Sequence, residues 1–393
     1  MRFSFVLRNL LKSLADTPLS ERPQMSAVEL RTKLTQHVTS QNLGREPPVS
    51  QSALEPRSMS ASWNRIILPL GSDPELRQLY QSSRGYLRFG QILEDLDSFA
   101  VWLSYTHNQG SCDLGTATHH PMGLVTACVD RIGGAAKPIR SDSDIVMQGH
   151  VTWVGRSSLE CSISFLQERD TGANDWVNVL NAKFVMVAKS PTTGNCCGNS
   201  EQRTLQSEHS LMKIPPSVDE QLIIHTLFTQ TLDAKRRSFK QRVLPANFEW
   251  MDNCKLKNVH IMFPQQRNLY GKIFGGFLMR TAFEVAWANA FVFCQSPPIP
   301  MAVDDIMFVK SVEVGSLLYL SSEVCYTEAS RMQVRVHAEV VNPTKGTQET
   351  TNTFHFTFQT QDGSAVRSVM PRTYSDGMLY LDGRRHYHEA LRH

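Results

Sequence analysis

The stretch QQRNLYGKIFGGFLMRTAFEVAWA (Gln265–Ala288) decides the fold of this 393-residue chain. Apolar residues dominate the run after Gly275 and Gly276, which predicts a long helix that starts at the glycine pair. Glycine has no side chain, so a ligand can come close to the backbone N–H groups at that helix start. The Gly-Lys-Ser/Thr sequence of phosphate-binding loops is absent, so we expect a polarised oxygen other than a phosphate there.

The same unit is written twice along the chain. A helix within YLRFGQILEDLDSFAVWLSYTHN precedes the strand GLVTACVDRI, and the helix of the opening stretch precedes PMAVDDIMFVKSVEVG. Val-Asp-x-Ile stands in both strands, at 129–132 and 303–306. Three alternating segments follow each time and predict further strands. They are 144–154, 158–166 and 176–188 in the first copy, and 317–326, 332–341 and 350–358 in the second.

This order of elements predicts an α+β fold of two tandem domains, each a curved antiparallel sheet wrapped around a long central helix. Joined edge to edge, the two copies make one continuous sheet and hide each other's edge strands. We expect domains at 61–190 and 246–361, a linker with a helix at 191–245, and a C-terminal tail at 362–393. The first copy carries about a dozen extra residues in the loop QGSCDLGTATHHP.

Residues 1–60 are expected to be a transit peptide and lead-in. The first acidic residue is Asp16, whereas Arg2, Arg8 and Lys12 precede it, and apolar residues recur there at helical spacing. Such a basic, amphipathic start is typical of mitochondrial import signals, and an ordinary surface helix is the alternative.

Composition excludes several classes of protein. A net charge of +3 and the lack of an arginine-rich stripe argue against nucleic acid, and no membrane span is expected. No Gly-x-Ser-x-Gly elbow of serine hydrolases occurs. His119-His120 and the tail HYHEALRH lack the spacing of a zinc protease, so neither a metal nor a cofactor is expected.

A family resemblance rests on several of these motifs together. The Asn-x-x-Gly-x-Ile-Phe-Gly-Gly helix start, the Val-Asp-x-Ile strands and their duplication resemble the hotdog acyl-coenzyme A thioesterases. RFGQILEDLDS, HVTWVG, FVMVA, AVDDIMF and MLYLDGRRH are similar to the vertebrate mitochondrial double-hotdog members, from about Trp63 to His386. The resemblance implies hydrolysis of acyl-CoA in the mitochondrial matrix, and homo-oligomers of double-hotdog units.

Donors for a thioester carbonyl are expected at the second helix start. The N–H groups of Gly275 and Gly276 and the positive end of the helix dipole suit an oxygen that gains charge in the transition state. Asn268 can orient water or donate a hydrogen bond, although an isolated Asn before a helix is more often a turn residue. The resemblance favours the functional interpretation, because related enzymes use an Asn at this place.

A carboxylate is required as general base or nucleophile. Asp130, or alternatively Asp97, is expected in that role, Asp304 is the counterpart of Asp130, and Glu284 is expected to contact substrate. Asp97 borders the apolar face of the first helix, and the resemblance implies an acid at its place. In the second copy Phe283 takes that place, and Glu284 follows one residue late. On the strands, alternation predicts Asp130 on the face of Thr126, Cys128 and Ile132, and Asp304 on that of Ala302, Ile306 and Phe308. The resemblance implies a catalytic role for the Asp of Val-Asp-x-Ile.

The two copies are not equivalent, because the place of Asn268 falls near Ser82 in the first. We expect one junction to hold Asn268, Gly275 and Gly276 with Asp130 and Asp97, and to be the working site. The other would hold Ser82 with Asp304 and Glu284.

Two further functions stay open at this point. One is a non-catalytic acyl-CoA-binding scaffold on the same fold. The other is a hotdog enoyl-CoA hydratase or dehydratase, which would need a His near the helix acid.

Overall fold

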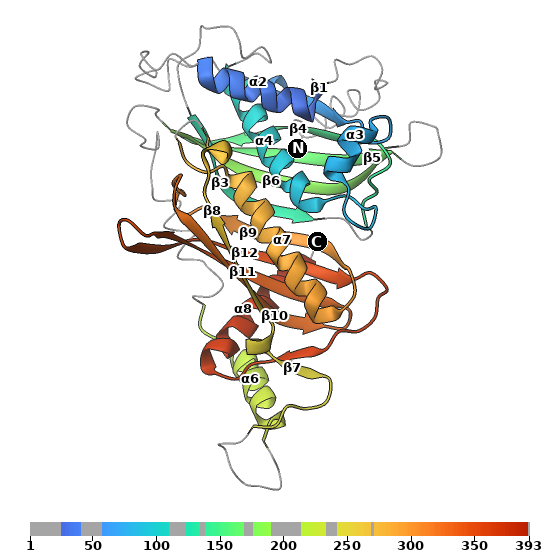
Figure 1. The fold of residues 1–393 in the computed structure, drawn as a ribbon, viewed down its shortest axis with the longest axis vertical. Coiled ribbons are helices and arrows are strands. Elements are labelled where there is room, and N and C mark those ends of the chain that lie inside the picture. Colours follow the sequence, from blue (N-terminus) through green and yellow to red (C-terminus); the bar gives the residue numbers. More distant parts are fainter. Residues whose placement is uncertain are drawn as a thin grey trace, which may run out of the picture.

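Two similar halves share one eleven-stranded sheet in the computed structural model, which describes residues 25–40, 57–109, 123–133, 138–168, 176–189, 214–232, 242–268 and 271–391 (Figure 1). The strand order is β1-β2-β4-β5-β6-β3-β9-β12-β11-β10-β8. The halves meet where β3 (Gly123–Gly133) pairs antiparallel with β9 (Pro298–Met307). The prediction of two hotdog domains joined edge to edge is confirmed.

The first half contains one central helix and five strands. These elements are β2 (Asn64–Leu68), α3 (Pro74–Tyr80), α4 (Phe89–Gln109), β3, β4 (Ile145–Val154), β5 (Ser158–Glu168) and β6 (Trp176–Lys189). They are preceded by β1 (Met25–Ser26) and α2 (Ala27–Ser40), which packs against α4. The proposed import signal, the loop around His119-His120 and most of the proposed linker lie outside the described residues.

The second half repeats this arrangement. Its elements are β8 (Lys255–Ile261), α7 (Gly275–Cys294), β9, β10 (Leu317–Glu328), β11 (Arg331–Asn342) and β12 (Thr347–Thr360). Before it come α6 (Val218–Gln230) and β7 (Phe248–Trp250), and after it β13 (Ser368–Met370) and α8 (Tyr374–Leu391). The two units therefore mirror each other about the β3–β9 pair, and the alternating segments of the sequence became strands within a few residues of their expected bounds.

The central helices α4 and α7 lie side by side over the sheet (Figure 1). Leu96 and Phe99 of α4 are fully buried, as are Met279 and Ala286 of α7. Among the described helices, α7 alone is long and apolar enough to cross a membrane, yet 61% of that stretch is buried inside the fold. Its hydrophobicity is that of a core helix.

The C-terminal tail is more structured than expected. Residues 362–393 contain the 18-residue helix α8, which packs on β9 to β12. On β12, Phe356 and Phe358 contact Phe283 of α7, and His355, the neighbour of Phe356, contacts His386 of α8. Because successive strand residues point to opposite faces, α7 and α8 cover the two faces of the second sheet.

Candidate active site

Asp97 lies at the junction of the two domains and is fully buried. It sits on α4, and its Oδ2 accepts a hydrogen bond of 2.6 Å from the backbone N–H of Gly276, at the start of α7. Its Oδ1 accepts one of 2.5 Å from the hydroxyl of Thr126 on β3. Three elements from two domains thus converge on one carboxylate.

Burial raises the pKa of the Asp97 carboxyl to about 6, and the nearby Glu94 carboxylate adds to the rise. The hydrogen bonds from Thr126 and Gly276 stabilise the charged form and lower the pKa, but they offset only part of the desolvation. A carboxylate with such a pKa is ionised at neutral pH and accepts a proton more readily than an exposed aspartate does.

The two glycines at the start of α7 have different roles. A Cβ on Gly276 would come within 3.0 Å of the Glu94 backbone and 3.1 Å of the Asp97 side chain, so only glycine allows α4 to approach this closely. The expectation that both N–H groups face a substrate is corrected, because Asp97 already accepts the hydrogen bond of Gly276. Gly275 lines the adjoining pocket.

Asn268 forms a tight turn just before α7. Its backbone N–H donates to Lys272 O at 2.6 Å, and its Oδ1 accepts from the Lys272 N–H at 3.1 Å. Gly271, with φ of +67°, closes this turn. Because Oδ1 is held by the backbone, the side chain is fixed with Nδ2 as its donor end. The turn and the functional interpretations of Asn268 are therefore compatible.

A pocket of about 560 Å³ adjoins these groups. Both domains line it: Thr126 comes from the first, and Asn268 and Gly275 come from the second. Its apolar wall and lysines are Val101, Leu124, Leu278, Phe308, Lys189, Lys272 and Lys310. Lys272 bonds Glu313 and Lys310 bonds Glu349, each at 2.9 Å. An apolar cleft beside a held carboxylate and basic side chains can accept an acyl chain with a charged carrier.

Asp130 and Asp304 are placed differently from the sequence-based expectation. Bulges between Thr126 and Cys128 and between Val129 and Arg131 break the alternation of β3, so Asp130 is exposed while Cys128 is buried. Neither Asp130 nor Asp97 lines the pocket with Asn268, but Asp97 is hydrogen-bonded to Thr126, which does.

Asp304 is buried, but its Oδ2 contacts His386 Nδ1 of α8 at 3.0 Å. It lies away from the second junction pocket as well.

Sequence reasoning missed Thr126 as a partner of the acid. The residue appeared only as a neighbour of Asp130 on an alternating strand. The predicted junction could have indicated this contact. Because β3 borders the other domain, a hydroxyl group on β3 can reach Asp97 on the central helix.

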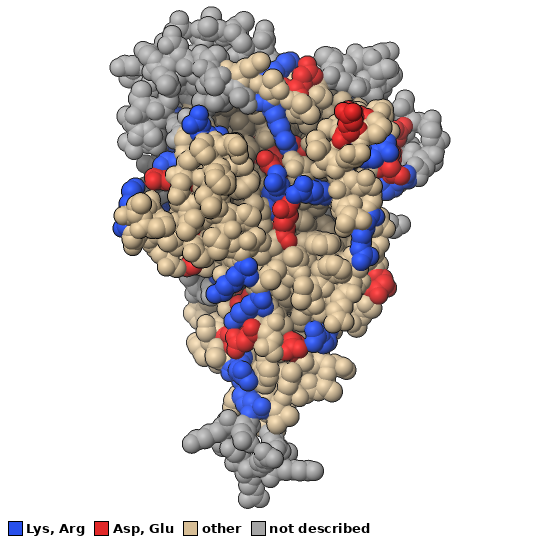
Figure 2. Space-filling model, in the orientation of Figure 1, with Lys and Arg blue, Asp and Glu red and all other residues tan. Residues whose placement is uncertain are grey.

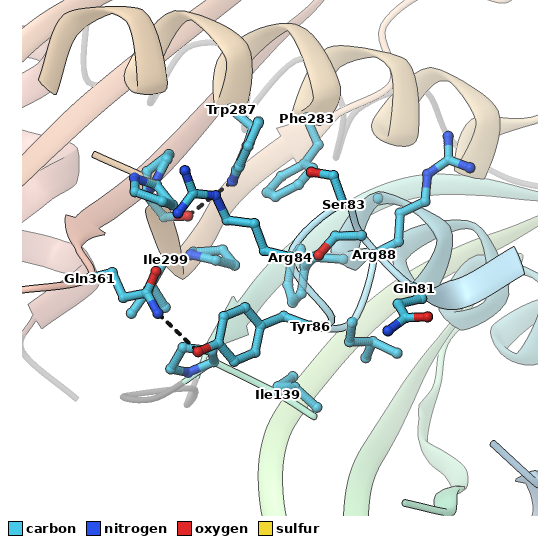
Figure 3. A pocket seen from close by; sticks show the side chains of 18 of the residues that line it. Gln81, Ser83, Arg84, Tyr86, Arg88, Ile139, Phe283, Trp287, Ile299 and Gln361 are labelled. Carbon is cyan, nitrogen blue, oxygen red and sulfur yellow. Dashed lines mark hydrogen bonds between the residues drawn. The ribbon is translucent and has the colours of Figure 1, made fainter. Parts of the chain in front are cut away.

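The second junction has different chemistry, although its elements are equivalent. The residues that line its pocket of about 480 Å³ include Ser82, Gly90, Phe283 and Glu284. Figure 3 shows this pocket, with Phe283 and Trp287 of α7 facing the segment that carries Arg84 and Tyr86. The rings of Phe89 and Phe283 lie 5.1 Å apart, where the first junction has the Gly275–Asp97 pair.

Glu284 accepts a hydrogen bond from Arg88 at 2.5 Å and belongs to an interdomain ion pair. In Figure 2, acidic and basic side chains alternate across the middle of the visible surface, and Arg280 and Glu94 form a second ion pair between the domains.

The fold and the junction define a double-hotdog protein in which one junction buries an aspartate that is hydrogen-bonded across the two domains. Human mitochondrial acyl-coenzyme A thioesterase 9 is 42% identical over 401 residues, which cover 97% of this chain and 87% of that protein. Mouse mitochondrial acyl-coenzyme A thioesterase 10 is 43% identical, over 86% of this chain and 80% of its own. A mitochondrial thioesterase 4 of Humulus lupulus is 34% identical, over 85% and 68%.

The chain therefore belongs to the acyl-coenzyme A thioesterase family and is a thioester hydrolase, and its animal relatives of types 9 and 10 are mitochondrial. A putative oleoyl thioesterase structure from Lactobacillus plantarum covers 76% of this chain and 95% of its own, with 14% identity and a TM-score of 0.46. No family model matches the chain.

Proposed function

We propose that the first junction hydrolyses acyl-CoA thioesters to a free fatty acid and coenzyme A, with Asp97 as the reacting carboxylate. The observation that carries this proposal is the buried Asp97, held by Gly276 and Thr126 next to the pocket that contains Asn268. Its raised pKa of about 6 suits a base that works near neutral pH.

The carbonyl oxygen is polarised by the start of α7. Gly275 lines the pocket, whereas the N–H of the next residue, Gly276, is already bonded to Asp97. The Gly275 N–H and the positive end of the helix dipole stabilise the oxyanion that develops there.

Hydrolysis then needs one water and no cofactor. Asp97 takes a proton from the water as its oxygen attacks the carbonyl carbon, and Asn268 Nδ2 orients that water. The tetrahedral intermediate breaks its C–S bond, and the proton passes from Asp97 to the departing thiolate. In the alternative, Asp97 itself attacks and forms an anhydride that water then hydrolyses.

Coenzyme A would lie with its phosphates toward Lys189, Lys272 and Lys310. These lysines border the same pocket as Asn268 and Gly275. Glu313 and Glu349 also line this pocket, so its three lysines leave a small excess of positive charge beside the apolar wall, which matches an anionic carrier and its acyl chain.

A thiol-release assay tests the assignment. With acyl-CoA substrates of several chain lengths, we expect Asp97→Asn to reduce kcat/KM by about 10²–10⁴-fold. Glu284→Gln is the matched control at the other junction and is expected to retain activity, because that acid forms an ion pair with Arg88. Equal losses in both variants would reject the assignment to the first junction.

The second junction is proposed to be inactive, because Phe283 stands where the first junction has Asp97 and Ser82 where the second domain has Asn268.

We further propose that double-hotdog units form homo-oligomers. Val218 and Leu222 on α6 are 80% and 63% exposed, and such apolar side chains are a contact that a second copy could cover. Light scattering on the wild type and on Leu222→Asp tests this: we expect a smaller species in the variant, and a monomeric wild type would refute it.

A further inference from the structure

Four buried ionisable side chains gather between the second sheet and α8, away from both junction pockets. His355 comes from β12 and Asp304 from β9, while Asp382 and His386 come from α8. Their exposed fractions are only 3 to 7%. Buried charges of this kind need partners or a bound ion.

The spacing around Asp382 is unusual for a hydrogen-bonded cluster. Its Oδ2 lies 3.7 Å from His355 Nε2, and its Oδ1 lies 3.7 Å from His386 Nε2. Both separations exceed hydrogen-bonding range. Two ligands bound at about 2.0–2.1 Å to one tetrahedral zinc ion are roughly 3.4 Å apart, so the observed gaps are close to those of a metal site.

Asp304 and His355 add two independent observations. Asp304 Oδ2 lies 3.0 Å from His386 Nδ1, which fixes that ring with Nε2 toward Asp382. A carboxylate behind a histidine is the usual outer partner of a metal-binding imidazole. On the other ring, Nδ1 of His355 is buried without a hydrogen-bond partner.

We propose that His355, Asp382 and His386 bind a divalent transition metal such as Zn²⁺, with Asp304 positioning His386. Two imidazoles and one carboxylate suit zinc better than calcium or magnesium, which prefer oxygen ligands. The imidazole rings are stacked with centroids 3.6 Å apart, so coordination requires one ring to turn. His355 is the ring that turns, because no hydrogen bond holds its Nδ1.

The role of this metal is structural. It would hold α8 against β12 and against β9, the strand that borders the domain junction. Near the end of α8, the backbone oxygen of Ala390 accepts a hydrogen bond of 2.6 Å from Arg131 of the first domain. A metal that fixes α8 therefore also stabilises a contact between the two domains, without touching the reacting carboxylate.

Metal analysis of the full chain tests the proposal. The purified protein is incubated with Zn²⁺, desalted and analysed by mass spectrometry, and we expect roughly one zinc ion per chain. Chelation should remove the metal and lower the unfolding temperature, and Zn²⁺ alone should restore it. A chain that retains no zinc and keeps its unfolding temperature in chelator would overturn the proposal.

Variants locate the ion. His355→Gln and Asp382→Asn should lose it, and Asp304→Asn should weaken zinc affinity about 10–100-fold in a competition titration. His337→Gln on β11 is the matched control and should bind zinc normally, because His337 contacts Glu339 outside the cluster.

If the ligand variants fail to fold, Co²⁺ bound to the wild type decides, since tetrahedral nitrogen and oxygen ligands give strong visible absorption bands. Zinc retained by folded His355→Gln, or cobalt spectra of an octahedral ion, would contradict the site. These readouts do not depend on thioesterase activity.

Discussion

Asp95 and Asp97 lie two positions apart on α4, and burial raises the pKa of each to about 6. Their partners differ. Asp95 contacts Arg31 of α2 and accepts a hydrogen bond of 2.7 Å from Tyr80, and neither partner belongs to the second domain. Asp97 is bonded across the junction. Comparing variants of these two residues therefore distinguishes the effect of a buried aspartate on stability from its effect on catalysis.

Replacing Asp97 by Asn tests both effects. Because the folded pKa of about 6 exceeds the unfolded value of 3.8, the stability that the neutral acid contributes is complete below about pH 4 and is lost as pH rises through about 6. At about pH 8, urea unfolding of Asp97→Asn should therefore show a free energy at least equal to that of the wild type. Activity should fall nonetheless.

The pH profile provides the control. Wild-type kcat/KM should rise with pH through about 6 as Asp97 ionises. Asp95→Asn should keep this limb, although it loses the contacts with Arg31 and Tyr80. If the acid limb disappears in Asp95→Asn, the group that ionises near pH 6 is Asp95, and the assignment of the base to Asp97 is wrong.

Thr126 should tune the same pKa. Its hydroxyl stabilises the ionised form of Asp97, so Thr126→Ala should raise the pKa and move the acid limb of kcat/KM to higher pH. Thr126→Ser keeps a donor and should stay near the wild-type profile. An unshifted limb in Thr126→Ala would show that the hydrogen bond does not influence the reacting group.

At the residue scale the sequence predicted part of the candidate site that the structure brings together. Asp97, Asn268 and Gly275 follow from helix periodicity, the glycine pair and the family resemblance. Asp130 was misplaced, because two β-bulges in β3 shift the phase of the strand and no residue pattern marks them. The partners of Asp304 come from α8, more than 80 residues further along the chain.

At the scale of elements, α4 and α7 can pack this closely only because residue 276 is glycine and has no side chain. Gly276→Ala would place Cβ 3.0 Å from the Glu94 backbone, and backbone cannot move aside as a side chain can. We expect this variant to separate the helices, break the hydrogen bond to Asp97 and reduce kcat/KM at least tenfold, as about an ångström of misplacement can.

The equivalent glycine of the first domain is the control. A Cβ on Gly90 would meet the flexible side chains of Arg280 and Glu284, the nearer contact being 3.1 Å. Gly90→Ala should therefore keep wild-type thiol release. Equal losses in Gly90→Ala and Gly276→Ala would indicate a general packing defect instead of an effect on the site.

Regular strands and central helices were predictable because their periodicity is strong. Helix α8 was not, since it contains Gly377 and Gly383, and glycine disfavours a helix interior. Gly383 is explained by packing, because a Cβ there would lie 2.4 Å from the Cys325 sulfur. The need for glycine at residue 383 follows from the packing of α8 on β10 and cannot be read from the sequence.

At the scale of the whole molecule, the two junctions divide their tasks. One buries the Asp97 carboxylate, and the other buries an aromatic cluster in which Phe283 contacts Phe89, Phe356 and Phe358. Duplication predicted the continuous sheet, because each copy alone would leave an edge strand unpaired. It also predicted that the copies differ, but which side chains meet across the junction depends on their three-dimensional register.

Phe283→Ala tests the structural task of the second junction. Removing this buried ring should lower the free energy of unfolding by about 3–5 kcal/mol, measured by urea denaturation. Thiol release per folded molecule should persist, because the carboxylate is at the other junction. Val292→Ala on the same helix is the control; Val292 is 71% exposed, so its loss should change stability by less than about 0.5 kcal/mol. Loss of activity without loss of stability in Phe283→Ala would contradict this division.

The most direct measurement is a double-mutant cycle between the domains, with kcat/KM for thiol release from acyl-CoA determined in Asn268→Ala, Asp97→Asn and the combined variant. Groups that act as one unit on the same thioester are strongly non-additive, so the double variant should be about as slow as the slower single variant. Losses that simply multiply, or full activity in Asp97→Asn, would contradict a single site built by both domains.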